Sequence, residues 1–311
     1  MSLDGSTLDV ADERANDQAF GRPGASRGQS AYPQLRFVSL VENGTHVLFG
    51  TQMGGYGTGE PALAKGVLPW LRPDMLCLAD RGMFSYELWN QARATGAELL
   101  WRIKKNLVLP SEKGLPDGSY LSRIYPSPGD RRRGLHGVVV RVIDYQLEGV
   151  ADYRLITTIL DPGKASAPEL AALYHERWEI DTALDELKTH LRGARIVLRS
   201  KRPDLVRIEN PLAGCSHRLA EQEAGPGAPG ILRPDDGPLR QPRPSKRPDL
   251  VRQEFYGLMM AHFASRGLMH EAALKADEDP DRLSFLHAVR VIRRKLPIFP
   301  TIPPRGEGGV P

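Results

Sequence analysis

The chain has 311 residues, enough for one large domain or two small ones, and its 41% hydrophobic content can build a sizeable core. Two cysteines are too few for a disulfide framework or a thiolate metal site, and no apolar run or leader pattern predicts a membrane span or secretion. The net charge of +4 and the pI near 9.1 agree with a nucleic-acid partner, but such values are too common to identify one. We therefore expect a protein of the reducing cytoplasm.

Residues 1–110 alternate between strand and helix patterns. Asn43 and Gly44 join two runs of alternating apolar residues, which is the strongest short signal for a β-hairpin. Asp4 lies on the first predicted strand, and Asp80 directly follows an apolar run typical of a buried strand. We expect strands over residues 3–10, 35–42, 45–52, 75–79 and 98–104, helices over 60–71 and 85–95, and a loop over 19–32. This order predicts an α/β fold, a ribonuclease-H-like mixed sheet flanked by helices.

A β-rich insertion is predicted before the next helix. Alternating segments indicate strands over residues 119–125, 137–147 and 153–160. We therefore expect the first part of the ribonuclease-H-like core over 1–110, the insertion over 111–162, and a helix that completes the core over 163–199. A basic run, Arg131 to Arg133, lies in the insertion and is typical of a solvated loop, with a phosphate contact as the alternative.

The helix that completes the core has clear start and stop signals. Ser166 and Glu169 have the spacing of a capping box, with Pro168 in the first turn, and Gly193 is placed to end the helix. One apolar stripe along it consists of Leu170, Leu173, Ile180, Leu184, Leu187 and Leu191. This stripe predicts packing on the sheet.

A polar stripe lies beside the apolar one. It consists of Tyr174, Arg177, Asp181 and Lys188. At about 100° per residue these side chains fall within about 60° of arc, and four such groups cannot all face a dry core. They favour a site that holds a metal ion and a polyanion. The alternative is an ordinary amphipathic helix whose charged face meets solvent.

Three motifs in order carry a family resemblance. The polar stripe has the spacing Tyr-x2-Arg-x3-Asp-x6-Lys. Two sequence motifs precede it, DGST at residues 4–7 and ADRGMFS at residues 79–85. Together they resemble bacterial insertion-sequence transposases of the DDE type, the IS4 family. The resemblance runs from about residue 4 to 201 and resumes from about 245 to 296.

The resemblance implies roles for six residues and a pair of metal ions. It implies catalytic and metal-binding roles for Asp4, Asp80 and Asp181, which would hold two ions of Mg²⁺ or Mn²⁺. It implies DNA-binding roles for Tyr174, Arg177 and Lys188. The family has Glu where Asp181 stands, and Asp is one methylene shorter. Glu179 lies about 200° further round the helix, so we do not expect it to substitute. Trp101 and Trp178 are expected in the core.

The C-terminal half contains a duplicated octapeptide. Residues 200–207 and 245–252 both read SKRPDLVR, and the segment between them is rich in Pro and Gly without an apolar period. We expect 200–252 to be a disordered insertion flanked by the repeat, 253–296 to form helices, one of them over 279–295, and 297–311 to be a flexible tail. The alternative to a disordered insertion is that the loop between the two repeats is a functional element.

The resemblance predicts a transposase catalytic domain that cleaves and joins DNA at element ends. Two alternatives remain, an inactive DNA-binding relic of such an enzyme and a ribonuclease-H-like nuclease without joining activity. Met1 lies three residues before Asp4, so we expect a core without the upstream DNA-binding region of the family. Expected partners are double-stranded DNA and, on that DNA, a second copy of the chain, in the bacterial cytoplasm near the nucleoid.

Overall fold

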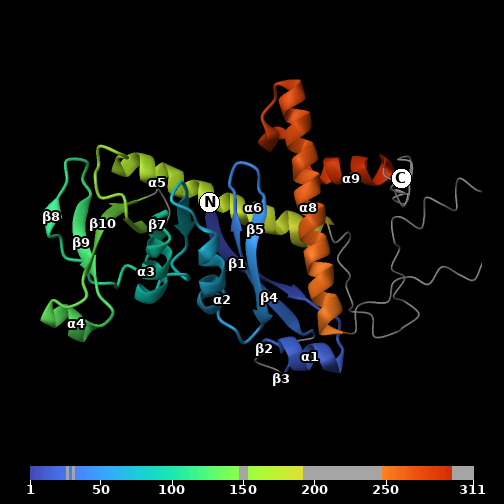
Figure 1. Cartoon of the computed structure of the whole chain (residues 1–311), viewed down its shortest axis with the longest axis horizontal. Coiled ribbons are helices and arrows are strands. Elements are labelled where there is room, and N and C mark those ends of the chain that lie inside the picture. Colours follow the sequence, from blue (N-terminus) through green and yellow to red (C-terminus); the bar gives the residue numbers. More distant parts are fainter. Residues whose placement is uncertain (26–27, 30–31, 147–152, 192–246, 296–311) are drawn as a thin grey trace, which may run out of the picture.

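A computed structural model describes residues 1–311 apart from 26–27, 30–31, 147–152, 192–246 and 296–311 (Figure 1). The described part forms a nine-stranded mixed sheet with helices on both faces, and the fold is ribonuclease-H-like as predicted. The strands are β1 (Ser2–Asp9), β4 (Gln34–Val41), β5 (Leu48–Gly55), β6 (Leu76–Ala79), β7 (Glu98–Arg102), β8 (Lys113–Gly114), β9 (Tyr120–Ile124), β10 (Val138–Tyr145) and β11 (Tyr153–Thr157), with a separate ribbon of β2 (Gly24–Ala25) and β3 (Gly28–Gln29). The helices are α1 (Arg14–Phe20), α2 (Glu60–Val67), α3 (Tyr86–Ala94), α4 (Pro128–Arg133), α5 (Ala167–His175), α6 (Glu179–Asp185), α8 (Pro248–Ala276) and α9 (Phe285–Lys295).

Three parallel strands form the centre of the sheet. The strand order is β5-β4-β1-β6-β7-β11-β10-β9-β8, with β1, β6 and β7 parallel and every other pair antiparallel. Leu3 of β1 is the register partner of Ala79 of β6. Because Asp4 and Asp80 each follow one member of that pair, both residues lie at the point where the pairing of β1 with β6 ends.

The two faces of the sheet have different helices. Helices α2 and α3 cover the face that carries Leu3, Ala79 and Leu99, while α5, α6 and α8 cover the face that carries Leu78 and Phe37. Since side chains alternate along a strand, Asp4 faces away from Leu3, toward α5 and α6. The helix pair thus lies over the acidic edge.

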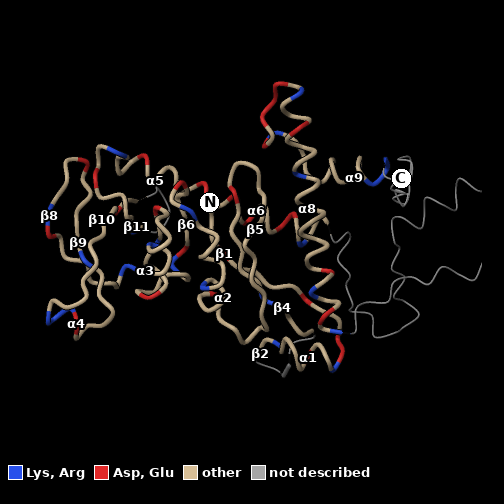
Figure 2. Tube along the Cα trace, viewed as in Figure 1, with Lys and Arg blue, Asp and Glu red and all other residues tan. Residues whose placement is uncertain are grey.

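The β-rich segment over 111–162 continues the same sheet. Its strand β11 pairs with β7, and β10, β9 and β8 follow outward in turn. The basic run of this segment, Arg131 to Arg133, lies on the short helix α4, where its side chains are exposed or half-buried. Figure 2 shows α4 and the basic end of α9 at opposite ends of the described structure.

The helix that carries the polar stripe, called the catalytic helix below after its expected role, begins as predicted but is not one continuous α-helix. Ser166 and Glu169 form the reciprocal capping box. A 3₁₀ turn, η2 (Glu176–Trp178), then separates α5 from α6, and a π-helical turn, η3 (Glu186–Leu191), follows α6. The prediction of a single regular α-helix up to Gly193 was therefore wrong. Residues 192 and 193 lie outside the described part of the chain.

Other expectations need correction. Helix α1 lies where no helix was predicted, and α8 begins at Pro248, within the second octapeptide, where the disordered insertion was expected to continue to 252. The helix predicted over 279–295 is broken into a 3₁₀ turn (Pro280–Arg282) and α9. Trp101 is fully buried as expected, but Trp178 is 52% exposed. The first octapeptide, the Pro- and Gly-rich segment and the tail lie outside the described residues.

None of the helices in the described ranges has the length and apolarity needed to cross a membrane.

Candidate active site

Asp4 is the centre of a group of charges between β1 and the catalytic helix. Its Oδ2 accepts a hydrogen bond from Arg177 Nη1 at 3.0 Å, and its Oδ1 accepts from the backbone N–H of Gly5 at 2.7 Å. Arg177 reaches Asp4 because the 3₁₀ turn places it on the sheet side of the helix, where only 7% of its surface is exposed. The pair joins the first strand to the last element of the core.

The pKa of Asp4 is raised from 3.8 to about 6. Burial is the largest cause, because it disfavours the charged form, and the nearby carboxylates of Asp80 and Asp181 raise the pKa further. The Gly5 amide and the Arg177 guanidinium act in the opposite direction without cancelling the shift. Two carboxylates distant in sequence, Asp80 and Asp181, therefore lie within electrostatic reach of Asp4.

Asp80 and Asp181 are less enclosed than Asp4. Asp80 Oδ1 accepts from the backbone N–H groups of Gly82 at 2.7 Å and Met83 at 3.3 Å, so Asp80 also shapes the turn after β6. The Asp181 side chain is 51% exposed, and its Oδ2 lies 3.9 Å from Arg177 Nη2. Asp181 is thus drawn toward the group by Arg177 but not enclosed in it.

The remaining two residues of the polar stripe fix the helix to the sheet. Tyr174 is 3% exposed and donates its hydroxyl proton to the carbonyl of Ala79 at 3.2 Å, and burial raises its pKa. Lys188 Nζ donates to Ser6 Oγ at 2.9 Å. Ser6 was not predicted as a site residue, although it shares the face of β1 with Asp4 two positions earlier.

The acidic group fits a divalent metal ion by donor type. Carboxylate oxygens are the ligands that hard ions such as Mg²⁺ prefer, and a cation would relieve the mutual repulsion that helps raise the pKa of Asp4. Among the described residues, no three His, Cys, Asp or Glu side chains lie close enough together to hold an ion as they stand. The three carboxylates therefore do not form a closed ligand set as they stand, and such a set would require the exposed Asp181 side chain to move inward.

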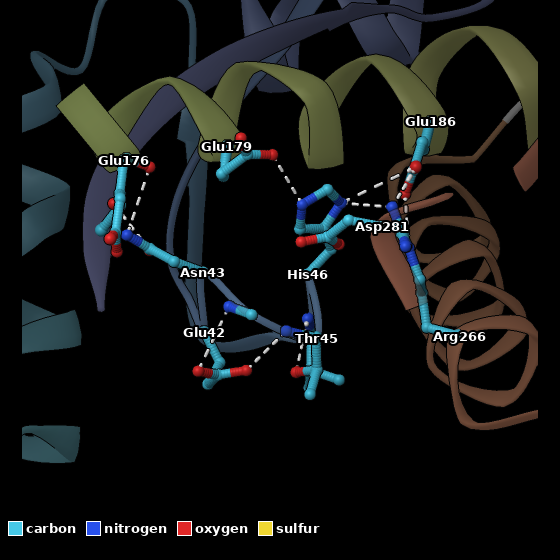
Figure 3. A network of polar contacts seen from close by, with 12 residues as sticks. Glu42, Asn43, Thr45, His46, Glu176, Glu179, Glu186, Arg266 and Asp281 are labelled. Atoms are coloured by element: carbon cyan, nitrogen blue, oxygen red, sulfur yellow. Dashed lines mark hydrogen bonds and ion pairs between the residues drawn. The ribbon is translucent and has the colours of Figure 1, made fainter. Parts of the chain in front are cut away.

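The β4–β5 loop contributes contacts that the sequence pattern did not predict. Asn43 Oδ1 accepts from Ser2 Oγ at 2.8 Å, while Asn43 Nδ2 donates to the carbonyl of Glu176 at 3.2 Å, at the 3₁₀ turn. His46 Nε2 lies 2.8 Å from Glu179 Oε2 (Figure 3). Glu179 thus faces the hairpin, which agrees with the expectation that it does not substitute for Asp181.

Comparisons with known proteins identify the family. The profile of the transposase DDE domain family matches residues 1–209. The chain belongs to this family. It is 29% identical over 214 residues to the transposase InsG for insertion sequence element IS4 of Escherichia coli, covering 67% of this chain and 48% of InsG. It is 26% identical over 102 residues to the putative transposase InsZ of the same organism, covering 32% of this chain and 34% of InsZ.

These matches confirm the resemblance to IS4-type DDE transposases, a family of DNA-binding proteins that use divalent metal ions. The matched part of the chain spans about half the length of InsG and about a third of InsZ.

Proposed function

We propose that this chain is the catalytic part of a transposase that cleaves DNA at the ends of an insertion sequence and joins the freed ends to a target. The position of Asp4 supports this proposal, because its carboxylate lies within electrostatic reach of both Asp80 and Asp181. Structural ion-pair networks also perturb pKa values, but here the perturbed carboxylate has two acidic neighbours and lies where parallel strands end. The match to an insertion-sequence transposase points to the same chemistry.

In this proposal Asp4, Asp80 and Asp181 hold two divalent ions, Mg²⁺ or Mn²⁺. Bound ions of this kind activate the attacking hydroxyl and stabilise the leaving oxygen. Lys188 is half-buried, so its ammonium is the most accessible cation of the stripe, and we assign it the contact with a DNA phosphate. Tyr174 and Arg177 are buried, so we assign them the positioning of the β6 end and of Asp4.

An inactive relic of such a transposase is the second candidate. Asp181 supports it, because this side chain is one methylene shorter than the Glu of the family and is half exposed to solvent. In that case the chain keeps its fold and its affinity for DNA but does not close the metal site. The proposal of an active transposase includes a second copy of the chain bound to the DNA, because the two ends of the element must react together.

Calorimetry with Mn²⁺ at pH 7.5 tests the proposal on the whole chain, on Asp80→Ala and on Asp74→Ala. Asp74 is a matched control because its carboxylate is 73% exposed at the opposite end of β6. Binding that is lost in Asp80→Ala and kept in Asp74→Ala supports the proposed site. Absence of binding in the unmodified chain contradicts it and favours the relic. Where Mn²⁺ binds, strand transfer with pre-cut ends separates joining from simple nuclease activity.

A further inference from the structure

A group of polar and charged side chains, all buried except the partly exposed Glu179, lies on the side of the catalytic helix that faces away from Asp4. Its members, which we call the clamp, are His46, Glu179, Glu186, His262 and Arg266 (Figure 3 labels all but His262). They come from the β4–β5 loop, from α6 and η3, and from α8. None of them belongs to the polar stripe, and the proposed chemistry leaves them without a role.

The clamp is built around the carboxylate of Glu186. Arg266 donates to it twice, from Nε to Oε2 at 2.9 Å and from Nη2 to Oε1, which is the two-pronged geometry that fixes a carboxylate in position. His262 Nε2 lies 3.0 Å from the same Oε2. Glu186 and Arg266 are 5% and 6% exposed, and His262 is fully buried. Contacts of this kind between buried charges leave little freedom of rotation.

His46 extends the clamp along the helix. Its Nδ1 accepts a hydrogen bond from Arg266 Nη2, so Nε2 carries the ring proton and donates it to Glu179 Oε2 at 2.8 Å. Glu179 and Glu186 lie seven positions apart, on either side of the junction between α6 and η3. His46 itself has a positive φ of 58°, a conformation that non-glycine residues seldom adopt without a local reason. The loop is therefore shaped to place this ring between the two carboxylates.

Stability alone does not account for such a group. Replacing a buried ion pair by apolar side chains of similar size is often neutral or stabilising, because the charges lose their hydration. What a charged, directional pair supplies is a single fixed arrangement. Here Glu186 is the first residue of the π-helical turn, and such turns are frequent at functional sites. Asp181 lies before that turn and Lys188 within it.

We propose that the clamp sets the rotation and axial position of the catalytic helix, so that Arg266 and Glu186 are positioning residues for Asp181 and Lys188. Helix α8, which begins within the second octapeptide, is then part of the catalytic unit. The effect on metal and DNA rests on the proposed function, whereas the effect on the helix does not. Arg293, which donates from α9 to the carbonyl of Leu191 at 3.0 Å, holds the far end of the same turn.

The test is the double apolar variant Glu186→Met with Arg266→Met, compared with the unmodified chain. The melting temperature, hydrogen exchange of the amides over 179–191, and Mn²⁺ affinity are measured on each. We expect a melting temperature close to that of the unmodified chain, at least tenfold faster exchange in η3, and a loss of Mn²⁺ affinity of about tenfold, the effect typical of residues that orient metal ligands. Unchanged exchange and unchanged affinity would overturn the proposal.

Two further variants keep the test decisive. Arg266→Lys retains the charge but not the two-pronged contact, so faster exchange in η3 is expected even if the double variant does not fold. Val140→Ala removes buried apolar surface from β10, away from the clamp, and should lower the melting temperature without changing exchange over 179–191. If the unmodified chain does not bind Mn²⁺, the proposed function fails. In that case hydrogen exchange over 179–191 alone tests whether the clamp holds the helix in position.

Discussion

Arg177 Nη1 lies 3.0 Å from Asp4 Oδ2, a contact between residues that are 173 positions apart in the chain. This ion pair does not restore an ordinary pKa to Asp4, because burial and the carboxylates of Asp80 and Asp181 outweigh it. The free protein therefore contains an electrostatic conflict on β1, next to the end of β6. A bound cation would resolve that conflict, and so would the loss of one charge.

Asp4→Asn should stabilise the free protein at neutral pH. The pKa of Asp4 is raised in the fold from 3.8 to about 6, so the folded state binds the proton more tightly than the unfolded state. Stability from this group is complete below about pH 4 and is lost as the pH rises through about 6. We expect Asp4→Asn to gain about 2 kcal/mol in the free energy of unfolding at pH 7.5 and nothing at pH 4, in urea titrations. A loss at pH 7.5 would show that the pair with Arg177 dominates.

Glu186→Gln should have the opposite pH dependence. Burial alone would raise the pKa of Glu186, but the hydrogen bond from His262 and the hydrogen bonds and charge of Arg266 outweigh it and lower the pKa from 4.5 to about 2. The carboxylate therefore stabilises the fold above about pH 4.5, and this contribution is lost as the pH falls toward 2. We expect a cost of about 3 kcal/mol at pH 7, with a smaller difference between the two proteins at pH 3.5. A difference that stays constant between these pH values would contradict the assignment.

Arg141→Met should be strongly destabilising. Arg141 is fully buried in β10, where it pairs with Asp117 and donates to the carbonyl of Ala165 at 2.8 Å. Asp117 in turn accepts from the backbone N–H of Ala167 at 2.7 Å, so the pair anchors the start of α5. Removing Arg141 leaves the largely buried Asp117 carboxylate without its counter-charge, and we expect a loss of about 3 kcal/mol in denaturant titrations. Arg154→Met, at a more exposed pair in the next strand, is the control and should cost about 1 kcal/mol or less.

Lys188→Ala should weaken DNA binding without changing sequence preference. A lysine that contacts phosphate contributes through charge, so its removal should lower affinity uniformly across sequences and reduce the slope of log affinity against log salt by about 1. Fluorescence anisotropy with short duplexes at several salt concentrations measures both quantities. Lys65→Ala is the matched control because Lys65 pairs with Glu87 between helices on the other face of the sheet. Equal effects of the two variants would show a general charge effect.

Much of this geometry could be predicted from local patterns. Strand periodicity placed Asp4 on β1, and the apolar run before Asp80 placed it at the end of a buried strand, so parallel pairing brings the two together. Ser166 and Glu169 fixed the start of the catalytic helix because a capping box acts over one turn.

The helix interior and its partners could not be predicted in the same way. Counting 100° per residue assumes an unbroken α-helix, and the turns at η2 and η3 change the phase before Lys188 is reached. The clamp joins His46 to Arg266 across 220 positions, and no local pattern pairs residues so far apart. An arginine within a stretch of α8 that contains no other Lys, Arg, Asp or Glu between 255 and 270 was the available signal for a buried partner.

Asp181→Glu distinguishes an active enzyme from a relic whose defect is the length of one side chain. Asp181 is half exposed, and its Oδ2 lies 3.9 Å from Arg177 Nη2, so an additional methylene lets the carboxylate extend toward Asp4. We expect Asp181→Glu to bind Mn²⁺ at least about tenfold more tightly, about 1.4 kcal/mol, and to cleave DNA faster than the unmodified chain. Asp185→Glu adds the same methylene to an exposed carboxylate one turn further along the helix and should change neither quantity. If Asp181→Glu changes neither the Mn²⁺ affinity nor the cleavage rate, the length of the side chain at position 181 is not what limits metal binding or cleavage.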